Sequence, residues 1–229
     1  MICQPARKVP NLAATCPHPK AFHQAIARRE IIGVVSPNGI GFKFALKRFV
    51  EKHYLKVVYC NVRYSESTRE VLVTLYRHLC NVKFSNMDYR KTTVFDLTRN
   101  LNERLRLGDN CLLCIDECSN LKPAQMEYFV QFLSDFNKPI GLVFRMNKYY
   151  ATVLSRNRKF QNSYKRLIKV VDNWRVLSSC TAEEVMDITR CCGVQDQMIL
   201  NDLVGASRLN LTILAKQVER IKQVRRTTT

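Results

Sequence analysis

The sequence predicts an α/β fold: a parallel sheet with helices on both faces, followed by a small α-helical lid. Up to residue 144, short apolar segments alternate with segments of helical periodicity. This alternation is typical of parallel strands joined by helical crossovers. After Trp174 only helical patterns remain. A chain of 229 residues is long enough for one domain with a small appendage.

The first predicted strand is the apolar run 31–35, which ends in a Gly-rich loop and is followed by a helix over 42–53. The remaining predicted elements are strands at 55–60, 111–115 and 140–144, helices at 68–82, 94–107 and 125–136, and lid helices at 182–191, 196–204 and 210–224. Thr181 and Glu184 form a capping box that is expected to start the first lid helix. We expect a lead-in over 1–21, a core over 22–178 and the lid over 179–229.

The chain is strongly basic, with 37 Lys and Arg against 19 Asp and Glu and a net charge of +18. Such an excess indicates a polyanionic partner. The sequence contains no run of 18 apolar residues, so we expect neither a membrane span nor a membrane partner. The proline-punctuated start lacks the apolar stretch of a signal peptide, which predicts a cytoplasmic protein.

Ten cysteines raise the question of disulfides or metal binding. Six lie in apolar segments and are expected to be free, buried thiols: Cys60, Cys111, Cys114, Cys118, Cys191 and Cys192. Cys111 and Cys114 share a predicted strand, where positions three apart face opposite sides and do not readily share one metal ion. Cys16 and His18 with His23 give only a weak zinc signal, because no second pair follows at finger spacing.

The Gly-rich loop after the first strand is where many proteins bind phosphates, through loop N–H groups and a helix N-terminus. The usual pattern is G-x-x-x-x-G-K-[ST]. Here Ser36 replaces the first Gly, Phe42 stands in the place of the Lys, Lys43 comes one residue late, and no Ser or Thr follows. By itself the loop fits a plain turn as well as a phosphate cradle.

A second motif favours the phosphate cradle. The apolar strand 111–115 ends in Asp116 and Glu117. In P-loop ATPases an Asp at this place holds Mg²⁺ and a Glu polarises the attacking water. An apolar strand that ends in two acids is common by chance. The same strand behind a Gly-rich strand–loop–helix unit is much less common.

Together these segments resemble the AAA+ P-loop ATPases, in particular the short transposition ATPases related to the bacteriophage Mu B protein and to transposon target-selection ATPases. The resemblance covers roughly residues 22–220. It is carried by residues 37–41 with 45–49, by 113–117 and by 141–144. It implies ATP and Mg²⁺ as cofactors, a homo-oligomer, and double-stranded DNA and a transposase as partners.

The resemblance also implies roles for individual residues. The nucleotide would be bound by Pro37, Asn38, Gly39, Ile40, Gly41, Lys43, Asp116 and Arg208, with Asp116 as the metal ligand. Glu117 would be the catalytic carboxylate that polarises the attacking water, Asn147 the polar sensor that orients water, and Arg166 the arginine that reaches a neighbouring subunit's nucleotide. For each arginine the alternative is a solvated surface charge.

The departures from the loop pattern all weaken phosphoryl transfer. Loss of the Lys removes charge stabilisation of the transition state, and loss of the hydroxyl removes one Mg²⁺ ligand. Lys43 compensates only if the loop is bulged by one residue; the alternative is that Phe42 fills the pocket. We therefore expect nucleotide binding with weak or lost hydrolysis.

The basic excess is concentrated in two segments. Nine Lys or Arg lie between Arg145 and Arg175 against one acid, Asp172, with aromatic residues interleaved. A second cluster ends the chain. The candidate DNA-binding residues are Lys148, Arg156, Arg158, Lys159, Lys165, Lys169, Arg225 and Arg226. No base-reading module is present, so we expect binding to be largely independent of DNA sequence and sensitive to salt.

Three functions stay open at this point. The leading one is a DNA-binding AAA+ protein that assembles on duplex DNA and serves transposition, by target selection or by delivery to a transposase. The second is a catalytically inactive adaptor of the same shape. The third is a helicase-loader or origin-recognition-type ATPase, although such proteins usually keep the Lys–Ser/Thr pair.

Overall fold

The computed structural model describes residues 18–53, 56–64, 66–80, 92–106, 111–136, 138, 140–158 and 160–227. The chain divides into two compact units. The first, the core unit, consists of Pro19–Ser36 and Leu46–Leu177. The second, the lid unit, contains Pro37–Ala45 and Ser178–Thr229, so the Gly-rich loop belongs with the C-terminal helices in this division.

The core unit is built on a five-stranded sheet in the order β2-β3-β4-β1-β5, and every pairing is parallel. The strands are β1 Ile31–Ser36, β2 Lys56–Asn61, β3 Cys111–Asp116, β4 Gly141–Asn147 and β5 Asn173–Val176. The predicted α/β fold is therefore confirmed, with four strands close to their expected positions. The edge strand β5 was not predicted.

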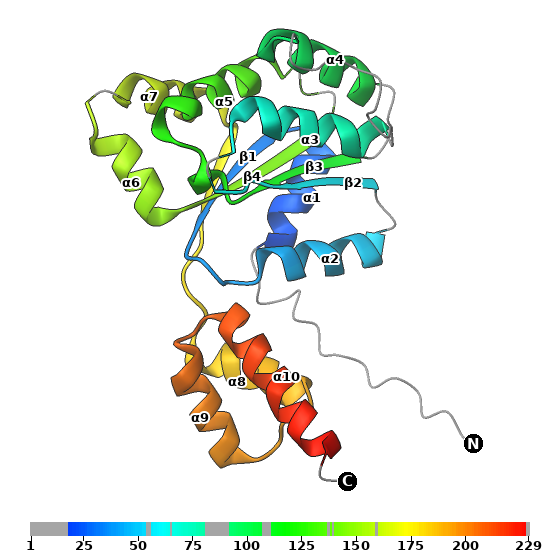
Figure 1. Ribbon diagram of the computed structural model, residues 1–229, viewed down its shortest axis with the longest axis vertical. Helices are drawn as coiled ribbons and strands as arrows, with labels where there is room; N and C mark the ends of the chain where they lie inside the picture. Colours follow the sequence, from blue (N-terminus) through cyan, green and yellow to red (C-terminus); the bar gives the residue numbers. More distant parts are fainter. Residues whose placement is uncertain are drawn as a thin grey trace. The chain divides into compact units, whose positions relative to one another are not determined.

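Helices cover both faces of this sheet. Among the described residues before the lid, the helices and the 3-10 turn are α1 His18–Arg28, α2 Phe42–His53, α3 Thr68–Cys80, α4 Val94–Arg106, η3 Cys118–Asn120, α5 Pro123–Asp135, α6 Lys148–Arg156 and α7 Gln161–Val170. Helices α3, α4, α5 and α7 lie on one face and α1 and α2 on the other (Figure 1). The predicted helices at 42–53, 68–82, 94–107 and 125–136 are present, whereas α1, α6 and α7 were not predicted.

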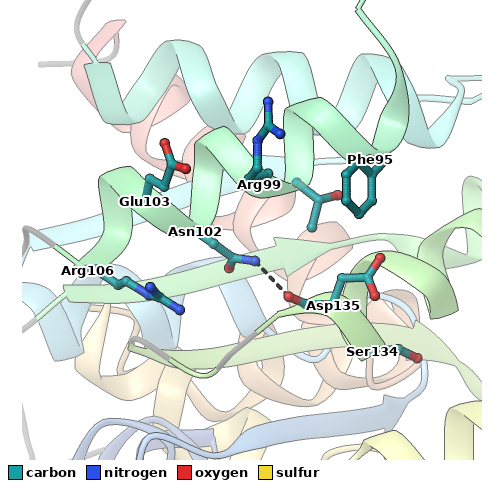
Figure 2. A pocket seen from close by; sticks show the side chains of 8 residues that line it. Phe95, Arg99, Asn102, Glu103, Arg106, Ser134 and Asp135 are labelled. Atoms are coloured by element: carbon teal, nitrogen blue, oxygen red, sulfur yellow. Dashed lines mark hydrogen bonds between the residues drawn. The ribbon is translucent and has the colours of Figure 1, made fainter.

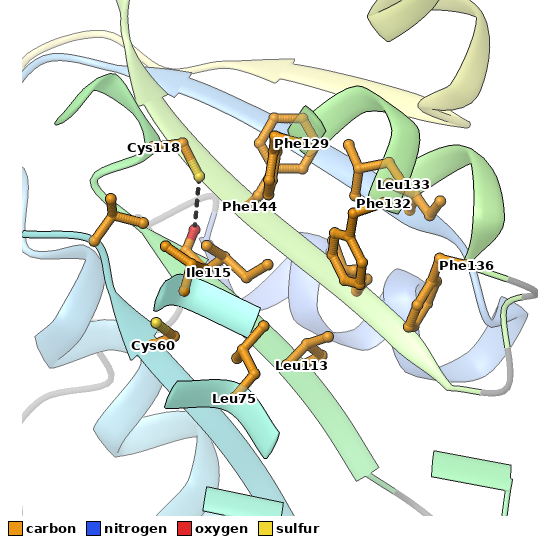
Figure 3. Packing of buried hydrophobic residues seen from close by; sticks show 14 of the residues in the cluster. Cys60, Leu75, Leu113, Ile115, Cys118, Phe129, Phe132, Leu133, Phe136 and Phe144 are labelled. Atoms are coloured by element: carbon orange, nitrogen blue, oxygen red, sulfur yellow. Dashed lines mark hydrogen bonds between the residues drawn. The ribbon is translucent and has the colours of Figure 1, made fainter. Parts of the chain in front are cut away.

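The main hydrophobic core lies between the sheet and the helices α3 to α7. Strand β3 is buried along its whole length, as is all but the last residue of β4. Phe129 of α5 packs edge-on against Phe144 of β4, with ring centroids 5.6 Å apart, and Phe132 and Phe136 continue this aromatic layer (Figure 3). This packing fixes β4 and therefore the residues at its carboxyl end.

The described cysteines are free thiols. Cys60, Cys111, Cys114 and Cys118 are buried, as predicted. The expectation of burial is wrong for Cys192, which is exposed just after the last turn of its helix. Among the described residues no group of three or more His, Cys, Asp or Glu is arranged to hold a metal ion.

The lid unit contains three helices, α8 Ala182–Cys191, α9 Gln197–Ser207 and α10 Leu211–Thr227. They enclose a small core that includes Val185, Leu203 and Leu214. The predicted capping box starts α8: Glu184 N–H donates to Thr181 Oγ1 at 3.2 Å and Thr181 N–H donates to Glu184 Oε2 at 2.8 Å. None of the helices in the described ranges combines the length and apolarity needed to cross a membrane.

Candidate functional site

Four neighbouring strands bring polar side chains to the carboxyl edge of the sheet. Because the strands are parallel, their carboxyl ends meet at one edge, where α/β proteins bind ligands. Ser36 ends β1, Asp116 ends β3 and Arg145 lies near the end of β4. Tyr59 reaches this edge from β2. The acidic pair predicted from the sequence is therefore placed at the expected edge, but with a basic partner.

Arg145 binds both members of the acidic pair. Its Nε donates to Asp116 Oδ1 and its Nη2 donates to Glu117 Oε1, both in very short contacts. Its Nη1 lies 3.4 Å from Ser36 Oγ. The residue is only 3% exposed. A sequence-based assignment of Arg145 to the exposed basic cluster is thus wrong, because a guanidinium with two carboxylate partners is stable in the interior.

Asp116 accepts two further hydrogen bonds. Oδ1 accepts the N–H of Glu117 at 2.8 Å, and Oδ2 accepts the hydroxyl of Tyr59 at 3.0 Å. The side chain of Asp116 is 7% exposed. Donors from β4, from β2 and from the turn after β3 therefore surround a carboxylate that is almost out of contact with water.

The electrostatics of this network keep Arg145 charged and Tyr59 neutral. Burial by itself lowers the pKa of Arg145, but the charges and hydrogen bonds of Asp116 and Glu117 outweigh burial and raise it. Burial, together with the charge and hydrogen bond of Asp116, raises the pKa of Tyr59 far above its ordinary value. Tyr59 is therefore a neutral hydrogen-bond donor at any physiological pH, and Arg145 is a permanent cation.

Glu117 has an unusual backbone conformation. Its φ of 56° lies in the left-handed region, at the start of the short turn η3. A non-Gly residue in this region costs about 1–3 kcal/mol and persists where the surroundings enforce it. The ion pair with Arg145 is one such constraint, and it directs the side chain of Glu117 back toward the sheet.

These residues do not fit Mg²⁺ at Asp116. Mg²⁺ requires near-octahedral oxygen ligands and usually keeps several waters, whereas Asp116 is buried and hydrogen-bonded on both oxygens. A dication 4 Å from the guanidinium would also be repelled by about 8 kcal/mol at an effective dielectric constant of about 20. The metal role expected for Asp116 has no support in this arrangement.

Asn147 is used as a helix cap. Its side-chain oxygen accepts the N–H of Tyr150 at 2.7 Å and so caps α6, while its own N–H donates to Ser119 Oγ at 2.6 Å. These bonds tie the end of β4 to α6 and to the turn after β3. The sensor role of Asn147 stays a prediction.

In the lid unit the Gly-rich loop packs against the start of α10. The N–H of Leu211 donates to the carbonyl of Gly39 at 2.7 Å. The side chain of Asn210 fills the space beside the Cα of Gly39, which has a φ of +80°. Phe42 is buried and Lys43 is exposed at the first turn of α2. Glycine is therefore required at position 39 both for its backbone conformation and for space.

The two arginines expected at the nucleotide lie in different surroundings. Arg166 of α7 donates from Nη2 to Gln131 Oε1 at 2.9 Å and lies 3.9 Å from Glu127, both on α5. Arg208 is exposed in a left-handed conformation at the C-cap of α9. Arg166 does not contact the acidic pair of its own core unit, and Arg208 belongs to the lid unit. The nucleotide roles of both arginines stay predictions.

The candidate DNA-binding residues of the core unit gather on α6, on α7 and on the turn between these packed helices. All five described members are exposed, and within the described ranges none forms an ion pair: Lys148, Arg156, Arg158, Lys165 and Lys169. We call these five residues the α6–α7 basic surface. Lys159 lies outside the described residues, and the side chains of Arg225 and Arg226 in α10 are not described.

The aromatic residues interleaved with these cations have different roles. Tyr149 is 79% exposed next to Lys148. Tyr150 is buried and donates its hydroxyl to the carbonyl of Leu121 at 2.6 Å, and Phe160 and Tyr164 pack against the core. Tyr149 is thus the one exposed residue among these four aromatic side chains, and the other three contribute to packing.

A hollow of about 320 Å³ lies between α4 and the end of α5 (Figure 2). Asn102, whose Nδ2 donates to the carbonyl of Asp135 at 2.7 Å, is part of its lining, as are Phe95 and Arg99. None of the residues predicted from the sequence lines it. It is therefore separate from the acidic edge of the sheet.

Comparison with known proteins identifies the fold. No protein-family model matches the sequence, and no curated protein matches it. Among solved structures, Cdc6p from Pyrobaculum aerophilum matches with a TM-score of 0.61 at 16% identity, over 89% of this chain and 56% of that one. The RuvB Holliday junction branch migration motor of Thermotoga maritima matches with a TM-score of 0.53 at 15% identity, over 93% and 61%.

A third similar structure is the replication initiator DnaA bound to AMPPCP and single-stranded DNA, with a TM-score of 0.55 at 10% identity over 97% of this chain and 63% of that one. This chain therefore spans roughly three fifths of the length of these structures. At such low identities the likeness concerns the fold. The parallel sheet, its flanking helices and the shared architecture lead to one conclusion: the chain has the fold of the AAA+ P-loop ATPases.

Proposed function

We propose that this chain is a DNA-binding protein of the AAA+ fold that assembles on duplex DNA, with nucleotide binding as a control of assembly and with hydrolysis weak or lost. The α6–α7 basic surface is the observation that carries this proposal. Its five cations are exposed and have no acidic partner among the described residues. Phosphate groups are the polyanionic ligands that such a surface suits best.

The geometry favours backbone contact over base reading. The cations lie on two packed helices, and Tyr149 is the one exposed aromatic side chain among them. Lys and Arg that neutralise phosphates release counterions, so affinity falls steeply as salt rises. Assembly of several copies on one duplex would multiply these weak contacts into tight binding.

A paired charge-removal experiment tests the DNA proposal. The variant Lys165→Gln/Lys169→Gln removes two cations from α7, and Lys20→Gln/Lys47→Gln removes two exposed cations from α1 and α2. Duplex affinity is measured by fluorescence anisotropy over a range of salt concentrations. The α7 variant is expected to weaken binding and to reduce the slope of log K against log salt by about 0.9 for each lost phosphate contact. An equal loss of duplex affinity in both variants would refute the proposal that the α6–α7 basic surface is the DNA-binding site.

Nucleotide binding is the second part of the proposal. We infer that the nucleotide phosphates bind to the Gly-rich loop and to Arg208, all of which belong to the lid unit. The loop residues are Pro37, Asn38, Gly39, Ile40, Gly41 and Lys43. Support comes from the shared fold and from two similar structures with bound nucleotides or analogues: the Aeropyrum pernix ORC2 protein as ADPNP–ADP complexes and DnaA bound to AMPPCP. Calorimetry with ATP and ADP, with and without DNA, tests this part. Absence of heat at millimolar nucleotide would refute it.

Subunit contact through Arg166 belongs to the same proposal. In the monomer this arginine is held by Gln131 and by the exposed Glu127, partners weak enough to be exchanged for a neighbouring subunit's phosphate. Arg166→Ala is expected to reduce the nucleotide-dependent increase in mass on DNA, measured by analytical ultracentrifugation, while single-copy DNA binding is retained.

The proposed DNA-binding function has two candidate biological roles. The sequence resemblance supports service to a transposase, which requires uniform coverage of duplex DNA. The similarity to the replication initiator DnaA supports the alternative of an origin-recognition or helicase-loader protein, which requires discrete sites. Nuclease footprinting on a long duplex distinguishes them: continuous protection supports the first role, and isolated protected segments support the second.

A further inference from the structure

We propose that Arg145 takes the place of a metal ion beside the acidic pair Asp116 and Glu117. These three residues then form a structural ion-pair network and not a Mg²⁺ site. This inference deepens the part of the proposed function that concerns hydrolysis. It does not depend on DNA binding, since its test contains no DNA.

The first step of the argument is the position of Arg145 within β4. All residues of this strand from Gly141 to Met146 are buried, and Arg145 is the only charged residue among them. An unpaired guanidinium in such a place would be very costly. Its location is explained by the two carboxylates on the neighbouring strand and turn, which bind it through separate nitrogens.

The second step is the hydrogen bonding of Asp116. Its two oxygens accept from Arg145, from the N–H of Glu117 and from Tyr59. The high pKa of Tyr59 keeps that hydroxyl a donor. A metal ion at the position taken by Arg145 or by Tyr59 would have to displace a donor held by β4 or β2, both of which pair with other strands of the sheet.

The third step is charge. Asp116 and Glu117 carry two negative charges, and Arg145 supplies one permanent positive charge in contact with both. A divalent ion at the same carboxylates would then face a fixed cation at short range. The attraction that recruits Mg²⁺ to a pair of free carboxylates is therefore largely cancelled in this chain.

The test measures the effect of Mg²⁺ on unfolding of the core unit. Trp174 in β5 is the only tryptophan of the chain and reports on this unit. The proposal expects the denaturation midpoint of the wild type to be the same in Mg²⁺ and in EDTA. Arg145→Met removes the cation that neutralises Asp116 and Glu117. The denaturation midpoint of this variant is expected to rise with Mg²⁺. The control Arg104→Met, at an exposed position in α4, should behave like the wild type.

Two further variants keep the proposal testable if Arg145→Met does not fold. Arg145→Lys keeps the cation and should stay insensitive to Mg²⁺. The double variant Asp116→Asn/Arg145→Met removes one acid together with the arginine and should not gain a metal site. Direct Mn²⁺ binding to the wild type, followed by electron paramagnetic resonance with ADP present, gives a readout that requires no variant.

Three results would overturn the proposal. One is a Mg²⁺-dependent midpoint in the wild type that Asp116→Asn abolishes. Another is a wild-type Mn²⁺ signal that is lost on the same substitution. The third is a folded Arg145→Met protein that gains no response to Mg²⁺, since the arginine would then not be what excludes the metal. Loss of DNA binding in the lysine variants of α7 would refute the DNA proposal and leave this one unaffected.

Discussion

Replacement of Asp116 by Asn distinguishes a structural ion pair from a metal site, because the two interpretations predict changes of opposite sign in the free energy of unfolding. In a metal site without its ion, carboxylates repel one another, and loss of one charge leaves stability unchanged or raises it. Here Asp116 is paired with the buried Arg145, and Asn has the same shape without the charge. The substitution is therefore expected to destabilise the core unit.

The size of the expected stability loss follows from the burial of Asp116 and Arg145. Asp116 and Arg145 are 5% and 3% exposed, and removal of one partner of such a buried pair costs about 3–5 kcal/mol. Glu117 still binds the guanidinium, but its side chain is 30% exposed and compensates in part. We therefore expect a loss of about 3 kcal/mol, which corresponds to a fall in melting temperature of roughly 6–12 °C for a chain of this size.

Urea denaturation followed by the fluorescence of Trp174 measures this loss, with the m-value as a check that the same unit unfolds. Glu127→Gln is the matched control, because Glu127 is 65% exposed and lies 3.9 Å from Arg166. Its expected effect is below about 0.5 kcal/mol. An Asp116→Asn protein as stable as the wild type, or more stable, would refute the reasoning.

Three further predictions concern other parts of the molecule. Asn147→Ala removes the cap of α6 and should lower the free energy of unfolding by about 1 kcal/mol in the same urea assay; an unchanged value would contradict the cap. Gly39→Ala places a methyl group against Asn210 at a positive φ, so the amide of Leu211 should exchange faster in hydrogen-exchange experiments, while the amide of Leu200 in α9 serves as the control. Burial raises the pKa of the Cys60 thiol to about 12 and that of the Cys114 thiol well above its ordinary value. Because the reactive thiolate is then scarce at pH 8, labelling followed by mass spectrometry should find exposed Cys192 modified in the native protein and these two cysteines modified only after unfolding.

Much of the fold could be predicted because its central elements have clear patterns. The continuous apolar runs of β1, β3 and β4 mark buried parallel strands, and the stripes of α3 and α4 mark helices that pack on them. Thr181 and Glu184 fixed the start of α8 to the residue. These signals are local, so they can be recognised without knowledge of the packing.

The elements that were missed have weak local signals. Helices α6 and α7 are short and rich in cations. Their few apolar residues, such as Leu154 and Leu167, are buried only because α6 packs on β4 and β1 and α7 packs on α5 and α6. Strand β5 has four residues, and Trp174 is packed on the bare Cα of Gly33 in the neighbouring strand. Such tertiary contacts decide these segments, and they are not visible along the sequence.

The candidate site was predicted in part. The apolar run before Asp116 and Glu117 correctly placed both carboxylates at the end of a strand. Their partner Arg145 was missed because it adjoins a run of surface cations and was counted with them. One signal was present: Arg145 stands between Phe144 and Met146 in a strand that is otherwise apolar. A charged residue in such a run requires an opposite charge nearby, and the sequence offers Asp116 and Glu117.

The hydrogen bond between Gly39 and Leu211 links the Gly-rich loop to the start of α10. Asn210 caps the N–H groups of Thr212 and Ile213, and Leu211 donates to the carbonyl of Gly39. The first three amides of α10 are therefore already satisfied, and none is left to attract an anion. A phosphate that reorganised the loop would have to break the bond to Leu211, and by thermodynamic reciprocity any partner that strained α10 would change the affinity of the loop for that phosphate by the same factor.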